Sequence, residues 1–85
     1  MTREQGSTQA EIRAILEAMF SKRRRRVDAL NPRAPLLLEL ELDSLDAVDF
    51  AMELERHFGV GMTERDIFDA TLESLANLID VRRST

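Results

Sequence analysis

The chain has 85 residues, enough for one small domain, because chains divide into separate cores only at roughly twice that length or more. Its hydrophobic fraction of 44% and charged fraction of 33% suit a soluble domain with a modest core and exclude a disordered tail. With no cysteine and one histidine, His57, the chain excludes a disulfide framework, a cysteine nucleophile and a metal cluster. Any thiol chemistry must therefore use a thiol supplied from outside.

The formal net charge of −4 is unevenly distributed along the chain. Residues 1–33 hold eight Lys or Arg against four Asp or Glu, whereas residues 34–85 hold four bases and twelve acids. Seven acids and no base lie from Glu39 to Glu55. Such a surface repels nucleic acid and attracts basic proteins, so we expect protein partners and no nucleic acid.

The apolar segments are too short to cross a membrane. The longest run, residues 34–38, is interrupted by Pro35 and falls far short of the roughly 20 residues that span a bilayer. The first seven residues have no apolar region behind a basic start, so they lack the pattern of a secretion signal. We therefore expect a cytoplasmic, monomeric protein without a membrane span.

The first predicted element is a helix over residues 8–25. Thr8 and Glu11 have the spacing of a capping box at its start. We expect residues 1–7 to form a flexible N-terminus, residues 8–82 a single domain and residues 83–85 a tail. The apolar stripe that predicts the helix is Ile12, Ile15, Leu16, Met19 and Phe20.

Residues 27–43 are predicted to be an extended loop. Pro32 and Pro35 oppose a helix, and residues 38–42 alternate apolar and acidic side chains as a half-buried strand does. A strand is the alternative prediction, but no second run in the chain offers it a partner. We therefore expect a loop that its leucines pin to the helices.

A second long helix is predicted over residues 44–57, with one acidic face and one broad apolar face. Gly59 and Gly61 indicate its end, because glycine commonly follows the last helical residue. The predicted buried face consists of Ala47, Val48, Phe50, Ala51, Leu54 and Phe58.

Two more helices are predicted after the glycines. Thr63 caps a short one that carries Ile67 and Phe68 inward, and Thr71 caps the last, whose apolar stripe fades at Arg82. The expected fold is all-α: a small four-helix bundle of three main helices and one short helix, with a long first loop.

Ser44 stands at the first position of the second long helix. Unpaired backbone N–H groups and the positive end of the helix dipole favour negative charge there, which suits a phosphate ester. The simpler interpretation is that Asp43 or Ser44 only caps the helix, and the two are compatible. A Ser44–His57 catalytic dyad is excluded, because 13 residues of helix separate the two side chains by ~20 Å.

The residues around Ser44 resemble the acyl carrier protein family. Residues 40–55 and Phe58 contain the Asp-Ser-Leu-Asp motif, at positions 43–46, that opens the second helix in that family. The similarity continues through residues 63–66 and 71–75 to Ile79. The helix lengths and the long first loop also agree.

The resemblance implies that Ser44, with Asp43 beside it, receives 4′-phosphopantetheine from coenzyme A, and that the thiol of this arm carries an acyl group as a thioester. It implies no catalytic residue and no metal ligand in the chain, which is then not an enzyme. The implied partners are a phosphopantetheinyl transferase, an acyl- or aminoacyl-loading ligase and a downstream transferase or synthase. By their position on the helix, the residues expected to contact these enzymes are Leu45, Asp46, Val48, Asp49, Met52 and Glu53.

The chain departs from the family at three places. Residues 39–41 read Glu-Leu-Glu where the family usually has Asp-Leu-Gly, so a backbone conformation that glycine permits is affected before Ser44. The cations of Lys22–Arg26 and the basic Arg56 and His57 are unusual for fatty-acid carriers and favour a dedicated carrier with its own partners.

The five cations Lys22–Arg26 have three interpretations. The first is a solvated helix end, the second is a contact with one ligase or synthase, and the third is a nucleic-acid site.

Three function hypotheses stay open from sequence. The first is a carrier of fatty or polyketide acyl groups, and the second is a dedicated aminoacyl carrier loaded by an adenylating ligase. The third is a cofactor-free helical interaction module in which Asp43 and Ser44 only cap the helix.

Overall fold

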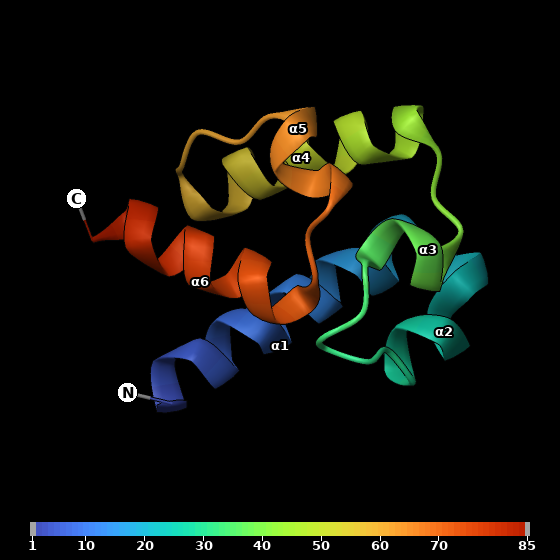
Figure 1. Ribbon diagram of the computed structural model, residues 1–85, viewed down its shortest axis with the longest axis horizontal. Coiled ribbons are helices and arrows are strands. Elements are labelled where there is room, and N and C mark those ends of the chain that lie inside the picture. The colour runs from blue at the N-terminus through green and yellow to red at the C-terminus, as the bar shows by residue number, and fades with distance from the viewer. Residues whose placement is uncertain (1, 85) are drawn as a thin grey trace.

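Three long helices and several one-turn helices make up the fold. The computed structural model describes the backbone of residues 2–84 and the side chains from Ser7 to Ser84, except that of Arg24. The long helix α1 packs against both α6 and α4, and both chain ends lie on one side of the molecule (Figure 1). The described residues contain no strand, so the predicted all-α bundle of three main helices is confirmed. The elements are α1 (Thr2–Met19), the 3₁₀ helix η1 (Ser21–Arg23), α2 (Arg24–Asp28), α3 (Leu36–Leu40), α4 (Ser44–Phe58), α5 (Glu64–Phe68) and α6 (Leu72–Arg83).

Helix α1 begins at Thr2, six residues before the predicted start. Thr8 lies fully buried inside the helix, and its hydroxyl donates a hydrogen bond of 2.6 Å to Oδ1 of Asp80 on α6. The predicted capping box of Thr8 and Glu11 is therefore wrong, because this hydroxyl joins two helices instead of closing a helix end.

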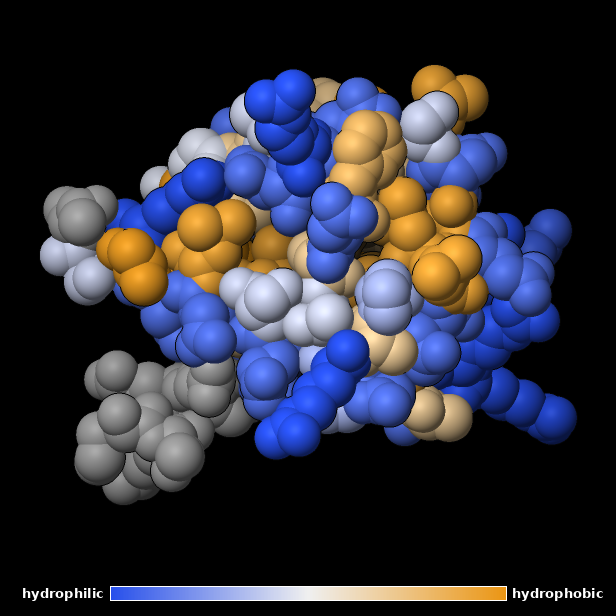
Figure 2. Space-filling model, in the orientation of Figure 1, coloured by the Kyte–Doolittle hydropathy of each residue, from blue (hydrophilic) through white to orange (hydrophobic). Residues whose placement is uncertain are grey.

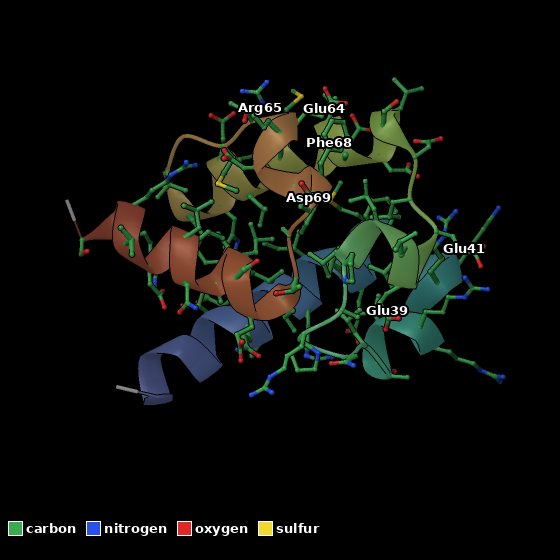
Figure 3. All side chains as sticks on the ribbon, viewed as in Figure 1. Glu39, Glu41, Glu64, Arg65, Phe68 and Asp69 are labelled. Atoms are coloured by element: carbon green, nitrogen blue, oxygen red, sulfur yellow. The ribbon has the colours of Figure 1, made fainter. Side chains whose placement is uncertain are left out.

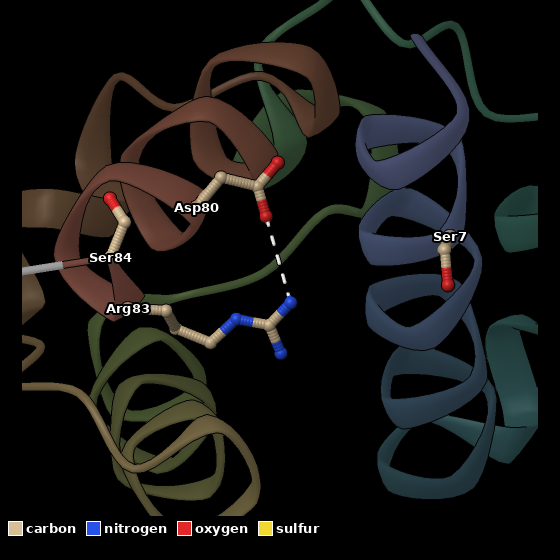
Figure 4. A pocket seen from close by; sticks show the side chains of 4 residues that line it. All are labelled: Ser7, Asp80, Arg83 and Ser84. Atoms are coloured by element: carbon tan, nitrogen blue, oxygen red, sulfur yellow. Dashed lines mark ion pairs between the residues drawn. The ribbon is translucent and has the colours of Figure 1, made fainter. Parts of the chain in front are cut away.

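Asp80, which accepts this hydrogen bond on α6, borders a small polar hollow. Ser7, Asp80, Arg83 and Ser84 line its volume of about 300 Å³, and Nη2 of Arg83 lies 3.8 Å from Oδ1 of Asp80 (Figure 4).

The predicted first helix also ends early, at Met19 rather than near residue 25. The chain turns at the buried Phe20 and continues as η1 and α2, which brings Val27 and Leu30 into the core. The guanidinium of Arg13 fastens the end of this segment to α1, since it donates to the carbonyl oxygens of Val27 at 2.9 Å and Leu30 at 3.2 Å. The carbonyls at the end of α2 thereby gain a donor from α1.

The first connection is neither an extended loop nor a strand, because residues 36–40 form the helical turn α3. Leu36 and Leu40 are buried on one side of it, so the leucines do pin the segment as predicted. Two backbone bonds fasten the connection to the start of α6: Leu36 N–H to the carbonyl of Ala70 and Glu73 N–H to that of Pro32, both 2.9 Å.

The core lies between α1, α4 and α6, with α5 and α3 closing it. Phe50 is its largest fully buried side chain. Of the apolar face predicted for the second long helix, Val48 is exposed instead of buried. The members of that face that are buried, as predicted, are Ala47, Phe50, Ala51, Leu54 and Phe58.

The remaining helix ends follow the sequence signals closely. Gly59 has a φ of 69°, the left-handed conformation that ends α4. Thr63 and Thr71 each form a capping box, at the starts of α5 and α6. Nη1 of Arg82 on α6 donates to Oδ2 of Asp66 at 2.9 Å and to the carbonyl of Gly61 at 2.6 Å, which ties α6 to the α4–α5 connection. No helix in the described part of the chain is long and apolar enough to span a membrane.

Candidate functional site

Ser44 is the first residue of the 15-residue helix α4, and its side chain is exposed. This end of α4 lies on the side of the molecule opposite the chain ends (Figure 1). The first N–H groups of a helix have no acceptor within the helix, so this position favours an anion. A group attached to the hydroxyl would therefore extend into solvent from the positive end of a long helix.

Asp43 caps α4, as the sequence predicted for this residue type. Its Oδ1 accepts a hydrogen bond of 2.8 Å from Asp46 N–H, while Oδ2 of Asp46 accepts one of 3.2 Å from Asp43 N–H. Both carboxylates are thus engaged with the backbone in a reciprocal capping box. Ser44 is left to face solvent, because the capping is done by its neighbours.

The chain reaches Ser44 through a tight turn at the end of α3. Leu42 N–H bonds to the carbonyl of Leu37 at 2.9 Å, and Glu41 N–H to that of Leu38 at 3.4 Å. These are the two bonds of a Schellman motif, which places a residue in the left-handed conformation just after the helix. That residue is Glu41, with φ 53° and ψ 49°, so the conformation that glycine favours is retained without glycine.

Two arginines of the basic cluster contact Glu41. Nη1 of Arg26 lies 2.5 Å from Oε2 of Glu41, and Nη2 of Arg23 donates to the Glu41 carbonyl at 3.4 Å. Glu41 lies where α3 ends, on the side of the basic residues of α2 (Figure 3). The hydrogen bond from Arg26, together with its charge, holds the pKa of the Glu41 carboxyl below its ordinary value.

The basic cluster lines a surface hollow of about 500 Å³. Its lining residues are Ser21, Lys22, Arg23, Arg25, Arg26 and Asp28; the side chain of Arg24 lies outside the described part. In Figure 2, strongly hydrophilic side chains form the edge beyond α2, next to apolar ones gathered over α3. The interpretation as a solvated helix end is therefore incomplete, because two of these arginines contact Glu41 in the turn before Ser44.

The predicted contact residues on α4 divide into an exposed apolar row and several acids. Leu45 is 74% exposed, Met52 54% and Val48 36%. Asp49 is also exposed, whereas Glu53 is partly buried and lies 3.6 Å from Nη1 of Arg56. The apolar row and Asp49 thus stand free for a partner, while Asp46 and Glu53 are already engaged within the chain.

The site fits the phosphopantetheine group that the resemblance implies. Ser44 is exposed, and the carboxylates nearest to it in sequence are turned to backbone N–H groups. No cluster of three His, Asp or Glu able to hold a metal ion occurs among the residues whose side chains are described. The exposed serine and the capping box beside it suit a carrier domain, which presents a prosthetic arm.

Comparison with known proteins agrees with this class. Residues 11–79 match the family model described as the phosphopantetheine attachment site. The chain therefore belongs to the phosphopantetheine-attachment family, whose members carry covalent 4′-phosphopantetheine, are non-catalytic carriers and interact with phosphopantetheinyl transferases and biosynthetic enzymes. No curated protein and no solved structure matched the chain.

Sequence reasoning missed the contacts of Glu41 with Arg23 and Arg26. The arginines stand 18 and 15 positions before Glu41, so no helical spacing signalled the pairing. One signal was available: two of the departures from the family pattern, a glutamate before the motif and a run of cations, have opposite charges and are complementary.

Proposed function

We propose that Ser44 is the residue that bears 4′-phosphopantetheine and that the chain delivers an acyl or aminoacyl group, held as a thioester on that arm, to partner enzymes. The observation that carries this proposal is the exposed hydroxyl of Ser44 at the first position of α4, next to a capping box that engages both neighbouring carboxylates. When bound, the prosthetic group supplies the thiol that this cysteine-free chain lacks.

Attachment requires an enzyme from outside the chain. A phosphopantetheinyl transferase, with Mg²⁺ and its own base, removes the proton of the Ser44 hydroxyl as the oxygen bonds to the phosphorus of coenzyme A that bears the pantetheine. The bond from that phosphorus to the nucleotide breaks, and adenosine 3′,5′-bisphosphate leaves. The contribution of the chain is to present the hydroxyl at the positive end of α4.

Partner enzymes dock, in this proposal, along the exposed face of α4. Its apolar row of Leu45, Val48 and Met52 supplies a small apolar anchor, and Asp49 supplies charge that steers basic partners. Asp46 and Glu53 contribute less, because the chain itself engages them. We place this activity in the cytoplasm, with the chain acting as a monomer within one domain over residues 8–82.

Intact-mass spectrometry tests the proposal. The chain is incubated with coenzyme A, Mg²⁺ and a broad-specificity phosphopantetheinyl transferase. The wild type should gain one phosphopantetheine, whereas Ser44→Ala should gain none. Ser21→Ala is the matched control, because Ser21 is also an exposed serine at the start of a helix, and it should gain one phosphopantetheine as the wild type does. Equal gain by Ser44→Ala refutes the attachment site.

The same mass measurement addresses the cargo. The chain that bears phosphopantetheine with a free thiol is incubated in one of two ways. It receives either an acyl-coenzyme A with an acyltransferase, or an amino acid and ATP with an adenylating ligase. A stable mass gain with only one of them assigns the chain to acyl or to aminoacyl transfer.

A further inference from the structure

The left-handed residue Glu41 determines how the chain enters α4. Only Leu42 and Asp43 separate Glu41 from Ser44, and Asp43 is fixed by the capping box. Leu42 is buried and bonds back to Leu37, so it is also held in place. The left-handed conformation of Glu41 is therefore part of the turn that carries the chain from α3 to the serine.

A residue with a Cβ adopts this conformation at a cost in free energy that glycine does not have. Glu41 is the only residue other than glycine with a positive φ in the described part of the chain. Side-chain contacts that exist only when Glu41 is left-handed can offset that cost. The contacts from Arg26 to the carboxylate and from Arg23 to the carbonyl are made with Glu41 in this conformation.

We propose that Arg26, assisted by Arg23, is a positioning residue for the modification of Ser44, because it holds Glu41 in the left-handed turn that leads into α4. The inference rests on the function proposed for Ser44. It gives the basic cluster a role within the chain, in which α2 holds the segment that presents the attachment site.

The size of the effect follows from the exposure of the pair. The Arg26 and Glu41 side chains are 49% and 67% exposed, so solvent screens their attraction. An exposed pair of this kind changes an equilibrium by up to about fivefold. We therefore expect a two- to fivefold effect, diminished in ~1 M salt, where charges are screened within about 3 Å.

Amide hydrogen exchange of the unmodified chain tests the turn itself. Arg26→Ala should raise the exchange rate of Leu42 N–H about two- to fivefold, since that amide closes the Schellman motif. Arg25→Ala is the matched control, because Arg25 is an exposed residue of the same helix and its loss changes the net charge equally. It should leave the rate unchanged.

A glycine at position 41 makes the test specific. Glu41→Gly adopts the left-handed conformation without help, so adding Arg26→Ala to it should change neither the exchange of Leu42 nor the rate of phosphopantetheine transfer. In the wild-type background, Arg26→Ala should lower kcat/KM for transfer by the same two- to fivefold. Circular dichroism of each variant checks that the fold is retained.

Two results would overturn the inference: equal effects of Arg26→Ala and Arg25→Ala, or an effect of Arg26→Ala that persists in Glu41→Gly. A wild-type chain that accepts no phosphopantetheine would instead refute the proposed function, and the exchange rates would still show whether Arg26 holds the turn.

Discussion

The capping box at Asp43 should be measurable as stability of the whole domain. In Asp43→Ala, Asp46 N–H loses its 2.8 Å acceptor at the start of α4. Removal of such a cap costs about 1 kcal/mol, within a range of roughly 0.5–2 kcal/mol. For a domain of this length, 1 kcal/mol lowers Tm by about 4–8 °C.

Asp43→Asn separates the hydrogen bond from the charge. Asparagine caps a helix about as well as aspartate, so this variant should unfold within about 2 °C of the wild type, corresponding to a few tenths of a kcal/mol. Thermal unfolding followed by circular dichroism, with urea unfolding as a second measure, gives the comparison. If Asp43→Ala has the wild-type Tm, or if Asp43→Asn falls equally far, the capping account of this residue is wrong.

Three further predictions concern the core and the α6 contacts. Phe50→Ala should cost about 3–5 kcal/mol in urea unfolding, because Phe50 is fully buried, and a loss below about 1 kcal/mol would contradict the packing. Thr8→Val should cost about 1.5 kcal/mol by removing the bond to Asp80, whereas Thr8→Ser, which keeps the hydroxyl, should cost less. Hydrogen bonding by Arg82 lowers the pKa of Asp66. The stability that this pair contributes should therefore be complete above the ordinary Asp pKa of about 3.9 and be lost as the pH falls below it. If Tm falls with pH as steeply in Asp66→Asn as in the wild type, this prediction is wrong.

Local signals accounted for most of the helices. The caps at Thr63 and Thr71 were predicted correctly, since each depends on a partner three residues away. The end of α4 at Gly59 was also local, because glycine supplies the left-handed conformation by itself. Elements whose determinants lie within one turn of the chain were therefore accessible from sequence.

The errors arose where a distant residue decides the structure. Thr8 was predicted to be a cap from its spacing to Glu11, because its actual partner, Asp80, is 72 positions away and leaves no local signal. After the break at Met19, the chain returns to α1, where the guanidinium of Arg13 donates to the carbonyls of Val27 and Leu30, 14 and 17 positions away. No pattern within a single helix indicates such contacts.

The segment from Leu36 to Leu40 illustrates a different difficulty. The alternating apolar and acidic residues at 38–42 indicated a strand, and the missing partner strand favoured an extended loop, yet residues 36–40 form one helical turn with Leu36 and Leu40 buried. The turn ends at Glu41, where the usual glycine signal is missing. The candidate site was thus predicted at Ser44 and Asp43, but the turn that leads to it was not.

The central claim, attachment at Ser44, is tested most directly by tandem mass spectrometry of the phosphopantetheine-loaded chain after proteolysis. The account predicts that the added mass lies on the peptide containing Ser44 and fragments to that residue. Location of the added mass on Ser7, Ser21, Ser74 or Ser84 would contradict it.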